Sequence, residues 1–533
     1  MTTTVDSPPH TGSDPGVIHD ARRRRNILIA MCVALMGVIA SMSILNVAQQ
    51  ELAADFGATA GTVLWILNAY TLALAALLLP IGAIGDRWGR KPVLVVGLVV
   101  FGAATVLCAL ATGSGLLIVG RAAAGVGAAM IMPVTLSVLT SSFPAEERGQ
   151  AIGIWAGVAG AGGIIGMFVA ALMVDVATWR LAFLLPMILV VAALYLTLRA
   201  VPNSREHSGH PFDVVGSVLS ALAIGGIVLG IHEGPERGWG DTLTVAGLII
   251  GGGALIGFVL WEFTRDEPLL DVRTFANRGL AAGATAILLL TAVMFGIFLV
   301  LFPFLQAILG WSALHAAVGL LPMVVVMMPT AASAPKVAKR IGTRSTMLAG
   351  LALAASGLGL LAMMASVEGG YWSILPGLLV MGVGVGLSLT PSTEAITESL
   401  PADKQGVASA LNDTTRELGG AVGVALLGSI LASGYRGSLD DKTAGLPGEV
   451  VHVAGEGIAQ ALGLAGSPES GLDPSAAGRL VEAAKHAYVD GWVQSMWIGV
   501  AIVAVAFVFV LVRGPRRGHL DDVLDRPAMA DGE

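Results

Sequence analysis

Between two long apolar runs of the sequence lies the decapeptide Gly82-Ala83-Ile84-Gly85-Asp86-Arg87-Trp88-Gly89-Arg90-Lys91. Three basic residues after an apolar run are enough to anchor a membrane helix on its cytoplasmic side. Such an anchor requires neither Asp86 nor the glycines, which allow two helix ends to approach closely. A weaker copy follows a later apolar run, with Lys339 in place of the acid: Pro335-Lys336-Val337-Ala338-Lys339-Arg340-Ile341-Gly342-Thr343-Arg344. Two copies of one loop predict an internal repeat.

These loops belong to a chain that is apolar along most of its length. Of its 533 residues, 55% are hydrophobic and only 13% are charged, and the mean hydropathy is +0.80. A soluble protein carries roughly 25% charged residues. The 70 glycines have no Gly-X-Y period, and both cysteines, Cys32 and Cys108, lie in apolar runs. The composition therefore excludes collagen and a disulfide framework, and it predicts an all-α integral membrane protein.

Fourteen runs of the sequence are long enough to cross a membrane, which takes about 20 apolar residues. They are continuous rather than alternating, and this favours helices over the strands of an outer-membrane barrel. We place the spans at 26–48, 62–84, 92–112, 115–139, 150–172, 180–199, 213–232, 242–262, 279–305, 313–333, 345–367, 372–394, 405–432 and 489–512.

An even number of spans places both termini on one side of the membrane. If that side is the cytoplasm, the inner segments hold most of the 30 basic residues, and the short outer loops hold only Arg180 and Arg237. This is the charge bias of cytoplasmic loops. We therefore expect a multi-pass protein of the cytoplasmic membrane with both termini cytoplasmic. The first 20 residues are too polar for a signal peptide.

The positions of the two loop copies predict the domain organisation. They follow the second and tenth spans, which are equivalent if each half has six helices and spans 7 and 8 lie between the halves. We expect a disordered cytoplasmic N-terminus at 1–25, an N-terminal six-helix bundle at 26–200, a two-helix insertion with linkers at 201–278, a C-terminal six-helix bundle at 279–512 and a cytoplasmic tail at 513–533. Within the second bundle, 433–488 is expected to form a partly ordered external loop with a short helix near 475–487.

Ionisable residues inside the spans are candidates for function, because a charge in hydrocarbon is costly. Arg121 lies in the fourth span. Asp413, Arg416 and Glu417 lie in the thirteenth, at positions i, i+3 and i+4 of one helix face, with Asp413 on the order of 12–15 Å from the cytoplasmic end. Their net negative charge could be neutralised by a proton, by a cationic substrate or by Arg121. The simpler alternatives are a cluster that only holds helices together and an Arg121 that only reaches the interface.

The decapeptide closely resembles the signature loop of the major facilitator superfamily (MFS), and the chain resembles that superfamily's fourteen-span drug:proton antiporters, the QacA/EmrB-like family. The resemblance covers about 26–432 and the last span. It implies an MFS fold arranged 6 + 2 + 6 and proton-coupled export of amphipathic, drug-like molecules by alternating access. It rests further on Gly120-Arg121-Ala122, the Gly-rich 153–166, the thirteenth span at 406–423, Val174-Asp175, Trp179-Arg180, Phe212-Asp213, Gly238-Trp239 and Pro268-Leu269-Leu270-Asp271.

The same resemblance implies roles for individual residues. Proton coupling is expected of Asp413, Glu417, Arg121 and Arg416, and helix packing of Gly157, Gly162, Gly163 and Gly166. The gating loop comprises Gly82, Asp86, Arg87, Gly89, Arg90 and Lys91. The substrate cavity is expected to include Asn46, Trp65, Asn68, Tyr70, Asn412 and Asp413, although aromatic residues in the second span equally often serve packing.

The chain departs from the family pattern at several positions. Ser41 stands where the first span usually carries an acid, Ala124 stands where the fourth-span motif usually has Gln, and Gly163 and Met167 replace the prolines of the fifth span. Without the first-span acid, coupling depends more on Asp413 and Glu417. Its absence also favours neutral or lipid-like substrates over cationic drugs.

The sequence contains no enzyme constellation and no phosphate-binding loop, so we expect neither an enzyme nor an ATPase, and no cofactor, metal or nucleic acid. His232 and His315 are isolated. The expected partners are a small-molecule substrate, protons and the lipid bilayer, with 433–488 as a possible docking surface for an external protein. Three alternatives stay open: an uptake symporter or facilitator, an exporter of lipids or metabolites, and a membrane partner that transports nothing.

Overall fold

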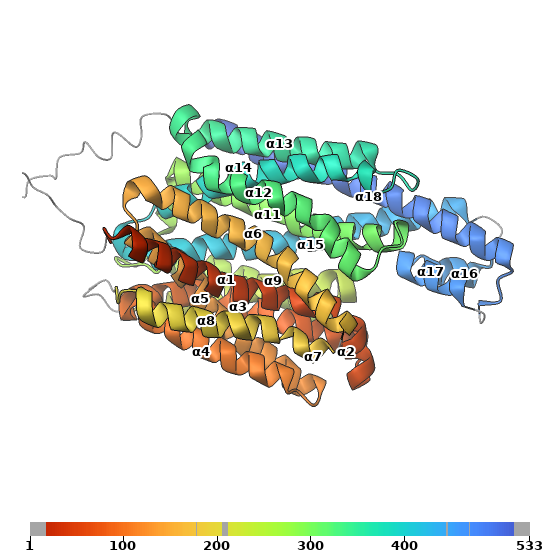
Figure 1. Ribbon diagram of the computed structural model, residues 1–533, viewed down its shortest axis with the longest axis horizontal. Helices are drawn as coiled ribbons and strands as arrows, with labels where there is room; N and C mark the ends of the chain where they lie inside the picture. Colours follow the sequence, from red (N-terminus) through yellow and green to blue (C-terminus); the bar gives the residue numbers. More distant parts are fainter. Residues whose placement is uncertain (1–17, 177, 205–211, 444–445, 468–469, 516–533) are drawn as a thin grey trace, which may run out of the picture.

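The computed structural model describes residues 18–176, 178–204, 212–443, 446–467 and 470–515 (Figure 1). Within these ranges there is no strand, and 14 helices are long and apolar enough to cross a membrane. Each predicted span falls in a different one of these helices. The predicted number of spans and the all-α class are therefore confirmed.

The spanning helices run side by side along the longest axis of the molecule (Figure 1). They are α1 (Ala21–Val47), α3 (Ala60–Trp88), α4 (Arg90–Ala109), α5 (Ser114–Ser142), α6 (Ala145–Val176), α7 (Trp179–Ala182) with α8 (Leu184–Ala200), α9 (Val214–Arg237), α10 (Thr242–Phe263), α11 (Arg278–Pro303), α12 (Ala313–Ile341), α13 (Thr343–Met364), α14 (Leu375–Thr397), α15 (Gln405–Lys442) and α18 (Pro474–Arg513). Shorter elements are α2 (Gln49–Phe56), α16 (Gly448–Ala454), α17 (Ile458–Gly466), the 3₁₀-helices η1 (Val272–Ala276), η3 (Tyr371–Ser373) and η4 (Ala402–Lys404), and the π-helix η2 (Phe304–Ile308).

The two loop copies have the same local structure. Gly89 ends α3 and Gly342 ends α12, with φ of 107° and 92°, a conformation that residues with a side chain adopt only under strain. The Gly89 N–H donates to the Gly85 carbonyl at 3.1 Å, and the Gly342 N–H donates to the Ala338 carbonyl at 2.8 Å. The loop backbone therefore repeats even though the second copy lacks the acid.

Helices α9 and α10, which lie between the two loop copies, pack on one another. Helix α9 also packs on α3 and on α15, so it contacts helices from both parts of the chain. The halves meet directly as well, where α12 packs on α6 and α15 packs on α3 and α5. Side chains of α9 therefore reach the zone in which the N-terminal and C-terminal helices meet.

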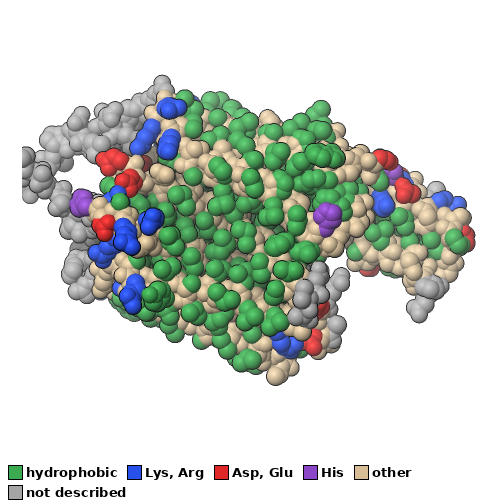
Figure 2. Space-filling view, in the orientation of Figure 1, with side chains coloured by type: hydrophobic (Ala, Val, Ile, Leu, Met, Phe, Trp, Pro, Cys, Tyr) green, Lys and Arg blue, Asp and Glu red, His purple; other side chains and the backbone are tan. Residues whose placement is uncertain are grey.

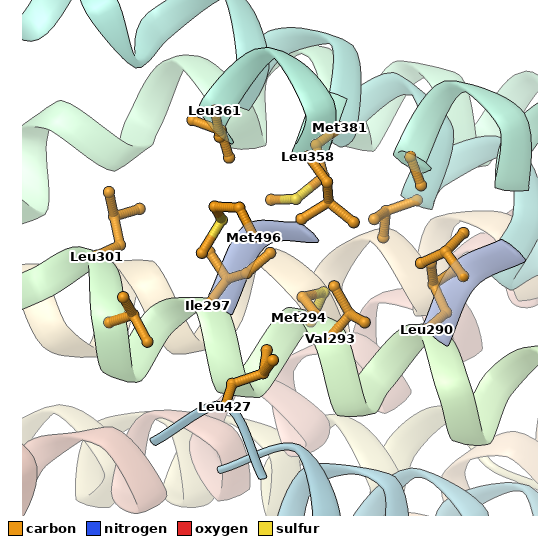
Figure 3. Close-up of a cluster of buried hydrophobic side chains, with 14 of the residues drawn as sticks. Leu290, Val293, Met294, Ile297, Leu301, Leu358, Leu361, Met381, Leu427 and Met496 are labelled. Carbon is orange, nitrogen blue, oxygen red and sulfur yellow. The ribbon is translucent and has the colours of Figure 1, made fainter. Parts of the chain in front are cut away.

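A large apolar core fills the C-terminal half (Figure 3). Leu290, Ile297 and Leu301 project from α11 toward side chains of four other helices: Leu358 of α13, Met381 of α14, Leu427 of α15 and Met496 of α18. Ile297 and Met496 are fully buried. The outer surface is also apolar, because hydrophobic side chains cover the middle of the face in Figure 2, while Lys and Arg gather at the end where α1 begins. Buried core and apolar surface together are what a bilayer requires of its proteins.

Segment 433–488 is more helical than the sequence suggested. Helix α15 continues to Lys442, α16 and α17 follow, and α18 begins at Pro474, so the short helix expected near 475–487 is the start of the last span. The Tyr435 hydroxyl donates to the Ala454 carbonyl at 3.0 Å, and the Tyr488 hydroxyl donates to the Val300 carbonyl at 2.6 Å. Tertiary packing of this kind stabilises helices whose glycine and serine content alone favours a loop.

Replacement of Gly423 by Ala is expected to destabilise the fold. Its added Cβ would overlap the Ala292 carbonyl oxygen where α15 crosses α11, and a backbone atom cannot turn away as a side chain can. Overpacking costs typically about 1–3 kcal/mol, and we expect the upper end of that range in thermal unfolding of the detergent-solubilised protein. The control is Gly437→Ala on the same helix, where nothing lies within 4 Å. Equal melting temperatures for the two variants would contradict the predicted close contact.

Candidate functional site

The carboxylate of Asp86, in the last turn of α3, binds the first turn of α15, 320 residues further along the chain. It accepts hydrogen bonds from the Gly406 N–H at 2.7 and 2.8 Å and from the Val407 N–H at 3.2 Å. A helix N-terminus presents unpaired N–H groups and a positive dipole end, so it favours a carboxylate. Arg90 forms an ion pair with the same carboxylate at 3.0 Å. We call Asp86, Arg90, Gly406 and Val407 the latch.

Two glycines allow the latch to close. A Cβ on Gly82 would lie 2.5 Å from the Gly406 carbonyl oxygen, and a Cβ on Gly406 would overlap the Gly82 carbonyl oxygen. Only hydrogen fits at both positions, so the backbones of α3 and α15 touch here. The glycines of the signature loop therefore have the role that the sequence suggested, close approach of two helix ends.

Gly89 and Lys91 of the predicted gating loop lie outside this contact. Gly89 forms the turn that ends α3. The Lys91 ammonium is turned toward α8, where it donates to the Leu198 carbonyl at 3.2 Å. Arg87 is half-buried in the last turn of α3. Gly89 and Lys91 thus position the loop on the N-terminal half, whereas Asp86 and Gly82 bridge to the other half.

Arg121 lies inside the N-terminal half, with only 1% of its surface exposed. Its guanidinium donates to the Ser41 carbonyl at 3.1 Å and hydroxyl at 3.2 Å, and to the Ile66 carbonyl at 3.4 Å. The face of the Tyr70 ring lies 4.3 Å from its central carbon, a distance at which the aromatic ring stabilises a cation. Arg121 is therefore held by groups inside the N-terminal half, and it forms no ion pair with a described acid.

Tyr70 has a different place from the one expected. It is fully buried, its hydroxyl donates to the Val38 carbonyl at 3.1 Å, and its ring packs edge-on against Phe101. The assignment of Tyr70 to a cavity wall is thus corrected, because this residue holds Arg121 inside the helix bundle. Trp65 and Asn68 are half-buried on the same helix, and the side chain of Asn46 lies outside the described residues.

Asp413 is fully buried on α15. One carboxylate oxygen accepts from the Asn412 amide at 3.0 Å, and the other has no hydrogen-bond partner among the described residues. The side-chain amide oxygen of Asn412 in turn accepts a hydrogen bond from the Thr393 hydroxyl of α14 at 3.1 Å. A buried carboxylate that lacks a partner for one oxygen is costly in its ionised form. Gain of a proton, or contact with a cation, therefore removes an energetic cost at Asp413.

Arg416 links this polar network to the N-terminal half. Its guanidinium lies 5.4 Å from the centre of the Trp155 ring on α6 and within 3.5 Å of the Thr393 hydroxyl. Trp155 is fully buried, and its indole N–H donates to the Thr135 hydroxyl of α5 at 3.1 Å. No ion pair joins Arg416 to Asp413 within the described chain. The residues around Asp413 thus connect α15 and α14 to α6 and α5.

Glu417, one turn beyond Asp413, faces other helices. It lines a small cavity together with residues of α3, α9 and α11. No hydrogen bond or ion pair joins Arg121 to either acid in the part of the chain that the structure describes. Among the described residues there is therefore no direct contact through which Arg121 could neutralise these acids.

The predicted glycines of α6 pack against two helices. A Cβ on Gly157 would lie 3.5 Å from the Met328 Cα on α12. Gly162, Gly163 and Gly166 face α1, and a Cβ on Gly166 would lie 2.7 Å from the Ala40 Cα. Helix α6 runs unbroken from Ala145 to Val176, in keeping with the missing prolines. These small residues let α6 pack closely on α1 of the N-terminal half and on α12 of the C-terminal half.

The sequence predicted no role for three residues of this region: Trp155, Thr393 and His232. Trp155 is the one aromatic residue in the Gly-rich stretch at 153–166, and this isolation is a signal that the sequence did offer. Thr393 carries no such signal, because threonines are frequent in membrane helices. The position of His232 beside Glu417 depends on the packing of α9.

Comparison with known proteins identifies the family. The model of the Major Facilitator Superfamily matches residues 29–424. The chain belongs to the major facilitator superfamily. This MFS protein is 32% identical over 512 residues to the multidrug efflux pump LfrA of Mycolicibacterium smegmatis, a match that covers 96% of this chain and 99% of LfrA. It is 31% identical to the tetracenomycin C resistance and export protein of Streptomyces glaucescens, over 91% of this chain and 90% of that protein.

Another relative of this MFS chain is the methyl viologen resistance protein SmvA of Salmonella typhimurium, with 28% identity over 92% of this chain and 99% of SmvA. Solved structures agree in fold at low sequence identity. The proton:xylose symporter XylE superimposes with a TM-score of 0.59 at 14% identity, covering 93% of this chain and 97% of that one. The human organic anion transporter MFSD10 gives 0.57 at 12% identity, covering 92% and 100%. These structures support the MFS fold alone.

Proposed function

We propose that this MFS protein exports amphipathic small molecules across the cytoplasmic membrane in exchange for protons. The observation that carries the proposal is Asp413, a buried carboxylate with one unpartnered oxygen in a network that connects the two halves. Intramembrane acids of this kind are rare and mark ion or substrate pathways. Similarity to the multidrug efflux pump LfrA and to the tetracenomycin C resistance and export protein supports the direction of transport.

The mechanism follows from the contacts of Asp413. A proton from outside converts the carboxylate to a neutral acid and removes its attraction for Arg416. The Arg416 guanidinium can then shift along the Trp155 face and the Thr393 hydroxyl, which belong to α6 and α14. When the proton leaves to the cytoplasm, the charge returns and a substrate can bind again. Mutual exclusion of proton and substrate at one acid is sufficient for antiport.

The latch supplies the other half of the cycle. In this structure it joins the end of α3 to the start of α15 at the side where basic residues gather, which we infer to be the cytoplasmic side. We propose that the spans divide as 6 + 2 + 6, with both termini cytoplasmic, and that the two six-helix bundles rock about the central site. Latch closure then corresponds to the state in which the cytoplasmic end is shut.

Ser41 bears on the substrate class. It replaces the acid expected in the first span, and its hydroxyl accepts from Arg121. The N-terminal half therefore offers a substrate no carboxylate at this position. We infer that neutral or weakly basic amphipathic molecules are transported better than permanent cations.

Everted membrane vesicles test this function. Their lumen corresponds to the outer side, and we expect them to accumulate tetracenomycin C when the lumen is acidified, with methyl viologen accumulated less. A protonophore should release the accumulated compound, because the proton gradient drives the transport. If either compound accumulates and a protonophore does not change its accumulation, proton-coupled export is contradicted.

An uptake symporter or facilitator is the second candidate, and the observation that favours it is Ser41. A symporter predicts uptake into right-side-out vesicles driven by an acid exterior and none into everted ones, whereas a facilitator predicts only equilibration, which a protonophore leaves unchanged. A third role, docking of an external protein on helices α16 and α17, predicts that export persists in vesicles but fails in cells when exposed residues of these helices are changed.

A further inference from the structure

The two-helix insertion contributes a histidine to the cavity that Glu417 lines. The cavity has a volume of about 70 Å³, and its polar wall comprises Thr71 of α3, His232 of α9 and Glu417 of α15. Phe295 of α11, Gly420 and Ala421 close it on the apolar side. Four helices that are distant in sequence meet here, and α9 is one of the two helices that lie between the loop copies.

The cavity has the properties of a hydrated site. No other described side chain or backbone group forms a hydrogen bond with the Glu417 carboxylate or with the His232 ring, and the Thr71 hydroxyl donates to the Asn68 carbonyl of its own helix at 3.3 Å. Buried polar groups of proteins are satisfied by protein or by water. A water needs roughly 10–15 Å³ of such volume, so this cavity has room for several.

The order of the groups along the membrane normal follows from their positions in the helices. His232 lies about 7 Å from the end of α9 at Arg237, at a rise of 1.5 Å per residue. Glu417 lies one turn of α15 beyond Asp413, and about 18 Å from the start of that helix. In the proposed orientation the sequence of groups from the outer side is therefore His232, the cavity, Glu417 and Asp413.

Other charges near the cavity are accounted for. On α9, Glu233 and Arg237 form an ion pair with each other at 2.5 Å. On α15, Arg416 is directed to Trp155 of α6. Arg121 of α5 is held by Ser41 and by Tyr70 of α3. Helix α11 carries its charged residue, Arg278, at its first position. His232 and Glu417 are thus the titratable pair that faces the cavity itself.

We propose that His232 and Glu417 form a proton relay through the inserted helix α9, by which protons from the outer side reach Asp413. This inference rests on the proposed proton-coupled export and names its route. Water on the outer side donates one proton to the free imidazole nitrogen. The imidazolium then releases a proton through cavity water to the Glu417 carboxylate, and Glu417 passes it to Asp413, one turn away on α15. His232 and Glu417 thus return to their starting charges, and Asp413 becomes neutral. Imidazole suits this role because its ordinary pKa lies in the physiological range.

The test compares wild type with His232→Gln in everted vesicles, using whichever of tetracenomycin C and methyl viologen wild type accumulates. Two rates are measured. One is accumulation driven by an acid lumen, taken as a function of lumenal pH. The other is exchange of labelled for unlabelled compound with a protonophore present, which needs binding and alternating access but no net proton movement. The control is His315→Gln, on α12, whose ring is stacked on Trp311 away from the cavity.

We expect His232→Gln to exchange compound at the wild-type rate, while its driven accumulation falls at least about tenfold and loses its dependence on lumenal pH. Glu417→Gln should show the same separation, and His315→Gln should match wild type. A wild-type pH profile in His232→Gln would overturn the relay alone, and so would an equal loss of exchange, which indicates a structural role. Wild-type transport of neither compound, or transport unaffected by the gradient, would overturn the relay and the proposed function together.

Discussion

Asp413→Asn is expected to abolish transport driven by a proton gradient and to slow exchange of substrate, because substrate binds in the proposed cycle only when this carboxylate is charged. Asparagine has the shape of the protonated acid and cannot release a proton, so the variant stays in the neutral state of the cycle. The carboxylate oxygen that it replaces has no hydrogen-bond partner, and the new amide therefore disrupts few contacts. Loss of a positioned proton-transfer group costs typically about 100-fold or more in rate, and we expect at least that reduction.

Everted vesicles again supply the measurement, with driven accumulation and protonophore-treated exchange recorded side by side. Asp403→Asn is the matched control, because Asp403 is an exposed acid that precedes the same helix and its substitution removes the same charge. Asp413→Asn should fail in driven accumulation and be slow in exchange, whereas Asp403→Asn should match wild type in both. Full driven export by Asp413→Asn, by Glu417→Gln and by the double variant would show that neither acid couples transport to protons.

Asp86→Asn is expected to open the cytoplasmic end of the protein. The substitution removes the charge that binds the α15 N-terminus and leaves Arg90, which is 2% exposed, without its counter-ion. Breaking a buried ion pair by removing one partner costs about 3 kcal/mol or more. Asp86 and Arg90 both belong to the N-terminal half, so loss of their ion pair affects the closed and the open state alike. The hydrogen bonds from the Gly406 and Val407 N–H groups exist only in the closed state. A hydrogen bond to a charged group contributes about 1.5–3 kcal/mol, so its weakening shifts the closed-to-open ratio by about 10-fold or more.

The measurement is a distance distribution between spin labels placed near the latch ends of α3 and α15, recorded with and without the substitution. The variant should populate longer distances, and its driven export should fall. Asp241→Asn is the control, because Asp241 caps α10 by accepting from the Leu243 N–H and Asn caps helices equally well. An unchanged distance distribution in Asp86→Asn would mean that the latch contributes nothing to closure.

The sequence alone predicted the features that depend on local composition. Insertion of a helix depends on the length and hydropathy of one continuous run, so the 14 spans could be read without any knowledge of their neighbours. The same holds for Arg121 and Asp413, which are conspicuous because a charge in a spanning run is costly wherever it lies. The glycines of the loop at Gly82 to Lys91 even indicated the close approach of two helix ends, which α3 and α15 make.

Only the tertiary structure decided which groups meet. Asp86 binds Gly406, Arg416 lies over Trp155, Tyr70 holds Arg121, and His232 shares a cavity with Glu417. Each pair joins different helices, and the helices of most pairs are distant in sequence, so the contact depends on how those helices cross and rotate rather than on either sequence segment. The helices of 433–488 have the same origin, because their stability comes from packing on α15 and α18. Hydropathy is a property of one run of residues, whereas a site is a property of the packing between runs.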